Sequence, residues 1–189
     1  MLKFQDVNKK LKCPEGWEPK FTQDWFSNRI PQWEAWLDPY APRLGKVLRP
    51  IKGMEIGAFE GKATLWLLEN IINFQYESCL FVVDTFQGGE DQVKNGIECS
   101  KLREIFEHNI IPFQEPFTKV PSKVRIFAEP SQTALLRMTG KFDFIYIDGS
   151  HLASDVFIDI ANSWRLLDVG GTLIFDDYAW RMESEPHKC

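Results

Sequence analysis

The chain has 189 residues, of which 44% are hydrophobic and 26% are charged. These values suit one globular domain with a sizeable core and leave no room for a second full domain. The net charge of −5 provides no general attraction to nucleic-acid phosphates or to anionic lipid. The N-terminus lacks the apolar core of a signal peptide, and no stretch approaches the ~20 apolar residues that span a bilayer, so we expect a cytoplasmic protein.

Residues 1–50 differ in composition from the rest of the chain and form the first predicted segment. From Pro14 to Pro42 the sequence holds seven aromatic residues and five prolines. Short helices broken by proline fit this pattern better than strands do. The aromatic residues favour a helical cap that packs on the rest of the domain, and the alternative is a lid over a substrate pocket.

From Ile51 onward, apolar strand patterns alternate with helical patterns. We predict strands at 53–57, 80–84, 124–128, 142–148 and 172–176, and helices at 62–74, 99–109, 132–138 and 153–167. Gly170 and Gly171 are expected to end the last helix. The alternation implies right-handed crossovers, so residues 51–189 are predicted to form a Rossmann-like, doubly wound α/β domain with a mostly parallel sheet of order 3-2-1-4-5. Residues 85–123 are long for one crossover and indicate either a substrate-facing insertion or surface decoration.

A turn bracketed by glycines follows the first predicted strand. Gly57 and Gly61 flank a short loop, and the helix that starts near Lys62 directs its amide N–H groups toward whatever binds there. Phe59 stands where a dinucleotide loop needs its second glycine, and Ile56 stands where a phosphate-binding P-loop needs its first. Both phosphate-binding interpretations therefore fail. The loop either receives another ligand or only permits a sharp turn.

Asp84 ends the second predicted strand, 27 residues after Gly57. In α/β nucleotide-binding folds, an acidic residue near this position binds the ribose hydroxyls. An ionised carboxylate can accept hydrogen bonds from two neighbouring hydroxyls at once. The alternative is a surface acid that caps the next element.

Three carboxylates are expected to meet at one edge of the sheet. Asp148 ends the fourth predicted strand, and Asp176 and Asp177 end the fifth, its neighbour in the predicted order. Carboxylates in one cleft repel each other unless one is protonated or a cation neutralises them. Oxygen ligands suit Mg²⁺ or a similar divalent ion, so we predict a metal site at Asp148, Asp176 and Asp177. The alternative is that Asp148 contacts a cofactor while the other two cap a turn.

His151 follows Asp148 by three residues, where the strand turns into a helix. One helical turn places it on the same side of the cleft as Asp148. A histidine there can take a proton from a substrate hydroxyl whose acidity a metal has raised. His151 and Asp148 are therefore the catalytic candidates, and the alternative is that Ser150 and His151 only cap the helix.

Four motifs together resemble the class I S-adenosylmethionine-dependent methyltransferases. They are Glu55-Ile-Gly57, Asp84-Thr-Phe, Ile147-Asp148-Gly-Ser-His151 and Phe175-Asp176-Asp177-Tyr. The resemblance covers roughly residues 50–180 and is closest to the branch of small-molecule O-methyltransferases that includes macrocin-type, sugar-modifying enzymes. It implies that Glu55 and the backbone of 57–61 hold the methionine part of the cofactor, that Asp84 binds the ribose, and that the 128–132 loop lies by the adenine.

The resemblance also implies the remaining site assignments. Its full cofactor-binding set is Glu55, Gly57, Ala58, Phe59, Gly61, Thr64, Asp84, Ser131 and Asp148. Asp148, Asp176 and Asp177 would hold the metal, and His151 would act as the base.

The implied function is transfer of a methyl group from S-adenosyl-L-methionine to a hydroxyl of a small molecule or sugar, with Mg²⁺ or a similar divalent cation. We expect no nucleic-acid or membrane partner, and a homodimer is compatible with the sequence. The resemblance implies a further helix and two strands beyond Cys189. Without them the alternative is a non-catalytic cofactor-binding module or a truncated methyltransferase subunit. A dinucleotide-dependent oxidoreductase is disfavoured by Phe59.

Overall fold

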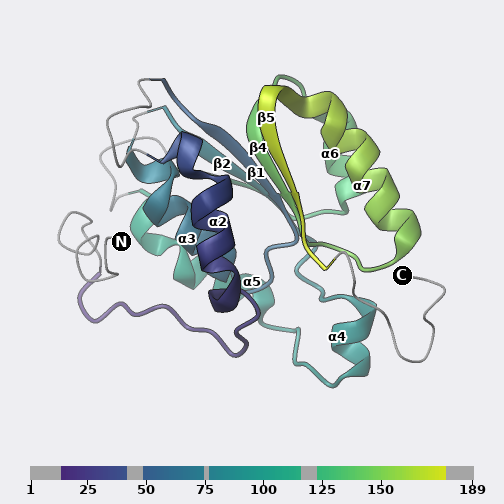
Figure 1. Cartoon of the computed structure of the whole chain (residues 1–189). Helices are drawn as coiled ribbons and strands as arrows, with labels where there is room; N and C mark the ends of the chain where they lie inside the picture. The colour runs from purple at the N-terminus through teal and green to yellow at the C-terminus, as the bar shows by residue number, and fades with distance from the viewer. Residues whose placement is uncertain (1–13, 42–48, 75–76, 116–122, 178–189) are drawn as a thin grey trace.

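The computed structural model describes residues 14–41, 49–74, 77–115 and 123–177 (Figure 1). Five parallel strands form one sheet of order β3-β2-β1-β4-β5, which confirms the predicted order. The strands are β1 (Lys52–Ile56), β2 (Cys79–Val83), β3 (Val124–Phe127), β4 (Phe142–Ile147) and β5 (Leu167–Phe175). Within the described residues, no helix is both long enough and apolar enough to cross a membrane. The strands expected beyond Cys189, and residues 178–189 themselves, lie outside the described part.

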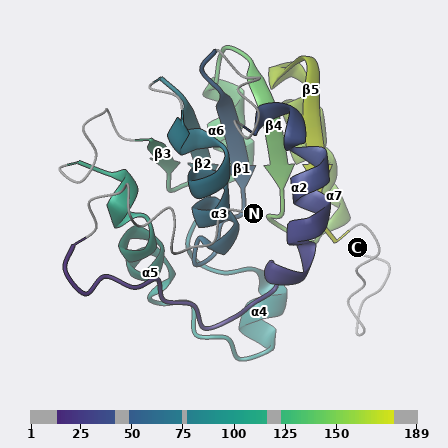
Figure 2. The same ribbon diagram turned by 60° about the vertical axis from the view of Figure 1, so that its left-hand side comes forward.

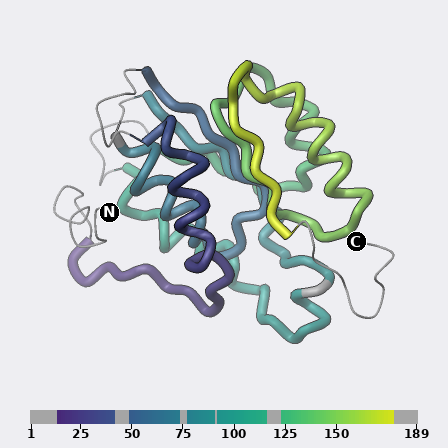
Figure 3. The backbone as a smooth tube through the Cα atoms, in the orientation of Figure 1, coloured from purple at the N-terminus to yellow at the C-terminus, as the bar shows by residue number. Residues whose placement is uncertain are grey.

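Helices cover both faces of the sheet. They are α2 (Ile30–Trp36), α3 (Lys62–Asn70), α4 (Glu90–Lys94), α5 (Leu102–Asn109), α6 (Ser131–Arg137) and α7 (Ala153–Leu166), with 3₁₀ turns η1 (Ser27–Arg29), η2 (Asp38–Tyr40), η4 (Ile72–Phe74) and η5 (Ile111–Phe113). Helices α2, α3 and α5 lie on one face, and α6 and α7 lie on the other (Figures 1 and 2). The short helix α4 lies beyond the carboxyl ends of the strands, as the backbone trace shows (Figure 3).

The apolar runs in the strands build two cores. In β2, Leu80 and Val82 belong to the core under α3 and α5, whereas Phe81 and Val83 belong to the core under α6 and α7. Neighbouring side chains of a strand point to opposite faces, so a continuous apolar strand is buried on both. Because all neighbouring strands pair in parallel, their carboxyl ends meet at one edge of this sheet.

The end of the last helix differs from the prediction. Helix α7 stops at Leu166, and β5 begins at Leu167 without a glycine cap. Gly170 and Gly171 lie inside β5, where the register against β4 shifts. Gly170 has φ +79°, and a Cβ on Gly171 would come within 2.9 Å of the Asp143 carbonyl oxygen. The expectation that these glycines end the helix is wrong, because they serve a bulge in the strand.

The N-terminal segment forms short helices, as its prolines predicted. Pro31 lies in the first turn of α2, where its missing N–H costs no hydrogen bond. Trp33 is buried, and its ring meets the Tyr146 ring edge-on at 4.5 Å between centroids. The Tyr40 hydroxyl donates to the Asp143 carbonyl oxygen at 2.8 Å. This part of the segment packs as a cap on the sheet.

Candidate active site

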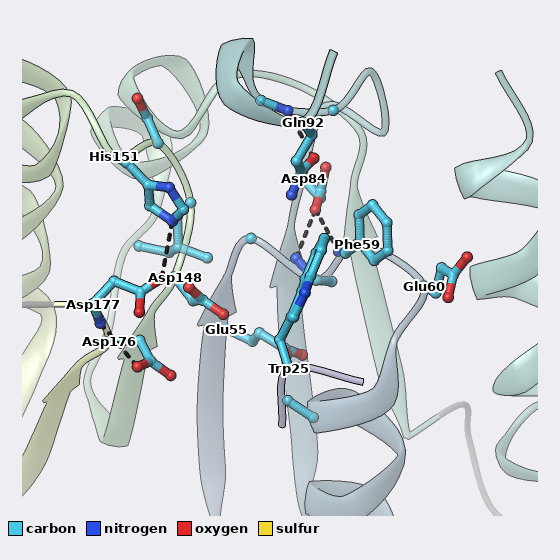
Figure 4. Close-up of a pocket in the computed structure, with 18 of the residues that line it drawn as sticks. Trp25, Glu55, Phe59, Glu60, Asp84, Gln92, Asp148, His151, Asp176 and Asp177 are labelled. Carbon is cyan, nitrogen blue, oxygen red and sulfur yellow. Dashed lines mark hydrogen bonds and ion pairs between the residues drawn. The ribbon is translucent and has the colours of Figure 1, made fainter. Parts of the chain in front are cut away.

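A cavity of about 760 Å³ opens at the carboxyl ends of the strands (Figure 4). Ten predicted site residues line it: Glu55, Gly57, Ala58, Phe59, Asp84, Ser131, Asp148, His151, Asp176 and Asp177. Gly61 and Thr64 were predicted to bind the cofactor but are not among the lining residues. Gly61 is the N-cap residue of α3, and a Cβ there would meet the Phe106 ring at 2.7 Å. Thr64 is fully buried and donates its hydroxyl hydrogen bond to Glu55.

The glycine-bracketed loop is held in shape by Asp84. Its Oδ2 accepts from the backbone N–H groups of Ala58 at 2.6 Å and Phe59 at 2.9 Å, and its Oδ1 accepts from the N–H of Phe86 at 2.6 Å. Phe59 has φ +51°, the left-handed conformation for which a dinucleotide loop uses glycine. Asp84 thus organises the loop as well as facing the cavity. The position of Asp84 at the end of a strand predicted that it faces the cavity. Nothing in the sequence indicated that it also holds the loop.

Glu55 is a buried carboxyl group with one free acceptor. Thr64 donates to its Oε2, whereas the buried Oε1 has no hydrogen-bond partner among the described residues. Burial raises the pKa of Glu55 to about 8. A cationic group in the cavity would supply the missing partner and favour the ionised form. The side chain therefore fits the ammonium group of S-adenosylmethionine, as the resemblance implies.

Tyr146 connects two of the predicted carboxylates and was not anticipated. Its Oη lies 2.7 Å from Asp148 Oδ2 and 2.7 Å from Asp176 Oδ2. The hydroxyl is the donor to both carboxylates and so brings them together. Burial raises the pKa of Asp148 to about 7, and the charges of Asp176 and Asp177 add to this effect, whereas the hydrogen bond from Tyr146 lowers the pKa.

Arg29 brings positive charge to this cluster from the N-terminal segment. Its Nη2 lies 3.3 Å from Asp176 Oδ1 and 3.6 Å from Asp177 Oδ1. His151 Nε2 lies 3.3 Å from Asp177 Oδ2. The hydrogen bond from His151 lowers the pKa of Asp177. The metal site was predicted because the three carboxylates repel one another. Arg29 and His151 offset part of that repulsion.

The oxygen and nitrogen donors that come together differ from the predicted metal set. Single donor atoms of Asp148, His151 and Asp177 all lie within 4.8 Å of one another. Asp176 is engaged elsewhere, because its Oδ2 contacts Tyr146 and its Oδ1 accepts from the Asp177 N–H at 2.8 Å. The three grouped donors fit a small divalent ion in number and type.

Two further segments line the cavity. From the N-terminal segment, Phe21, Trp25 and Arg29 are among the lining residues. The segment therefore borders the cavity with these residues and packs as a cap with Trp33 and Tyr40. From the long crossover, Gly88 and Gln92 reach the cavity, so this segment is not only surface decoration. Ser131 lines the cavity at the start of α6. Burial raises the pKa of Asp159 to about 6, although a hydrogen bond with Ser131 lowers it.

Comparison with known proteins identifies the family. A model described as a methyltransferase domain matches residues 54–178, more than half of the chain. A search of curated proteins finds no match. The fold is similar to that of precorrin 8w decarboxylase from Methanobacterium thermoautotrophicum, with a TM-score of 0.54 and 11% identity over 85% of this chain and 69% of that one. It is also similar to a SAM-dependent methyltransferase from Agrobacterium tumefaciens, with a TM-score of 0.54 and 14% identity over 84% of this chain and 48% of that one.

At such low identity the structural likeness shows the fold alone, and this chain spans about half the length of the second structure. The family model carries the functional assignment, and it agrees with the strand order and with the position of the cavity. The chain therefore belongs to the methyltransferase-domain family and is a class I methyltransferase, for which S-adenosylmethionine is the supported methyl donor.

Proposed function

We propose that this methyltransferase transfers a methyl group to a hydroxyl of a small molecule or sugar. The observation that carries the proposal is the placement of His151 beside Asp177 in the wall of the cavity. A hydroxyl is a weak nucleophile until it loses its proton, so a base at the acceptor position is useful. His151 Nε2 can take that proton, and Asp177 at 3.3 Å stabilises the resulting imidazolium.

The cofactor fits the opposite wall. Bound S-adenosylmethionine supplies an electrophilic methyl group on a positively charged sulfur. We assign the ammonium group to the unpartnered buried Oε1 of Glu55, the ribose to Asp84 and the adenine to the loop that contains Ser131, and all three residues line the cavity. These residues would orient the cofactor, and exclusion of water by the surrounding walls would favour transfer over hydrolysis.

We also propose that Asp148 and Asp177 hold a divalent cation such as Mg²⁺. A cation held there would lower the pKa of an acceptor hydroxyl. His151 Nε2 cannot ligate the cation and accept a proton at once, so we assign the base to His151 and the cation to the carboxylates. His151→Gln should then retain Mn²⁺ binding, measured by electron paramagnetic resonance, and lose transfer.

The proposal is tested by measuring S-adenosylhomocysteine formation against a panel of sugar and phenolic acceptors with Mg²⁺. We expect the wild type to turn over at least one acceptor. In His151→Gln the rate should fall by about 100-fold, with unchanged cofactor affinity. His108→Gln is the matched control, because His108 lies on α5 and is not among the lining residues. Equal losses in both variants would contradict the assignment of the base.

Binding without turnover is the second candidate. The ion pairs of Arg29 with Asp176 and Asp177 favour it, because they occupy carboxylates that an active centre would use. Saturable binding of S-adenosylmethionine with no product from any hydroxylated acceptor would select this alternative.

A further inference from the structure

Residues 20–29, here called the strap, cross from the glycine-bracketed loop to the end of β5. At the first end, the Lys20 N–H donates to Asn109 Oδ1 at 2.7 Å, and Asn109 Nδ2 donates to the Lys20 carbonyl at 2.8 Å. The N–H and the hydroxyl of Thr22 both donate to the Glu60 carboxylate at 2.6 Å. At the second end, Arg29 forms its ion pairs beyond β5. The strap is therefore anchored on both sides of the cavity.

The middle of the strap places Trp25 against the loop. Asp24 pairs with Lys62 at 2.6 Å, and the Trp25 and Phe59 rings lie 5.0 Å apart between centroids. Figure 4 shows the indole beside Phe59, in front of the loop, and Glu55 and Asp84 line the same cavity. Trp25 lines the cavity and remains 51% exposed. The indole thus stays half exposed in the wall of the cavity although both neighbouring parts of the strap are fastened.

We propose that Trp25 binds the cofactor and recognises its positively charged sulfonium. The inference rests on the proposed function, in which Glu55 holds the methionine part and Asp84 the ribose. The sulfonium joins those two parts, and Trp25 lines the same cavity as Glu55 and Asp84 and contacts Phe59 of the loop between β1 and α3. The face of an indole attracts cations.

This placement has a consequence for selectivity. The product S-adenosylhomocysteine has nearly the same shape, but its sulfur is uncharged. Trp25 therefore favours the methyl donor over the product by charge, and it assists product release. The two nearby cavity cations, Lys62 and Arg29, are each paired with carboxylates and leave this attraction largely unopposed.

Calorimetric titration of both ligands into matched variants tests the inference without any acceptor. In Trp25→Leu we expect S-adenosylmethionine to bind about tenfold more weakly and S-adenosylhomocysteine to change by about twofold or less. Trp25→Phe should fall between Trp25→Leu and the wild type, because phenyl attracts cations less than indole does. Trp36→Leu is the control, since Trp36 is similarly exposed at 49% but is not among the lining residues.

The outcomes separate the two levels of the proposal. Equal weakening of both ligands in Trp25→Leu, or no change in either, overturns the role of the sulfonium while leaving the methyltransferase proposal intact. Failure of the wild-type protein to bind either ligand overturns the proposed function and this inference with it. Circular dichroism of each variant identifies any loss of folding, and the affinity ratio in Trp25→Phe then still decides the question.

Discussion

At the scale of single residues, the site combines groups whose roles depend on partners far away in the sequence. Asp84 ends a strand and was expected to bind ribose, yet it accepts two backbone hydrogen bonds from the loop and a third from Phe86, which follows β2. The loop in turn keeps Phe59 in a left-handed conformation. If Asp84 also binds the cofactor as proposed, stability and cofactor binding are coupled through one carboxylate.

Replacing Asp84 tests this coupling. Asp84→Ala removes the acceptor of three N–H groups, so we expect the free energy of unfolding to fall by about 2–4 kcal/mol together with loss of S-adenosylmethionine binding. Urea denaturation without ligand and calorimetry with ligand measure the two effects. A variant that loses affinity at full stability would show that Asp84 acts on the ligand alone.

At the scale of elements, helix α3 carries the loop and buries an acidic side chain. Glu69 is 7% exposed, and burial raises its pKa to about 7. The folded state therefore holds a proton that the unfolded state releases at lower pH. Its contribution to stability falls as the pH rises from about 4.5 to about 7.

Glu69→Gln should therefore stabilise the protein more at pH 8 than at pH 4. We expect a gain of about 2 kcal/mol at pH 8 and little change at pH 4, from thermal or urea unfolding at both values. Glu107→Gln, at an exposed position on α5, should show no such difference. A gain of equal size at both pH values would point to packing rather than ionisation.

At the scale of the whole molecule, the N-terminal segment supplies charge to the far end of the sheet. Arg29 pairs with the carboxylates after β5, which are proposed to lie in or beside a cation site. A guanidinium and a divalent ion at the same carboxylates oppose each other. Arg29 therefore sets how tightly that site holds a cation.

Arg29→Gln should bind Mn²⁺ about fivefold more tightly than the wild type, because a competing positive charge is removed. Electron paramagnetic resonance titration measures this directly. Arg103→Gln removes an exposed arginine that pairs with Glu107 on α5 and provides the control. Weaker binding in Arg29→Gln would mean that Arg29 orients the carboxylates instead of competing for them.

The sequence predicted the sheet order and the meeting of Asp148, Asp176 and Asp177, because parallel strands end at one edge. It did not predict Tyr146, Arg29 or Trp25 as neighbours of that edge. Tyr146 looked like an ordinary apolar strand position, and the other two depend on how the N-terminal segment docks. That docking arises from contacts across long separations, such as Thr22 with Glu60, for which no local pattern exists.

The packing of Trp33 also determines where the folding unit begins. The family model starts at residue 54, whereas Trp33 lies edge-on against Tyr146 and Trp66 inside the core. A fragment cut at that boundary would lack the indole that packs edge-on against those two rings. The packed core is thus longer than the span that the family model matches, and two residues that line the cavity, Trp25 and Arg29, also lie before that span.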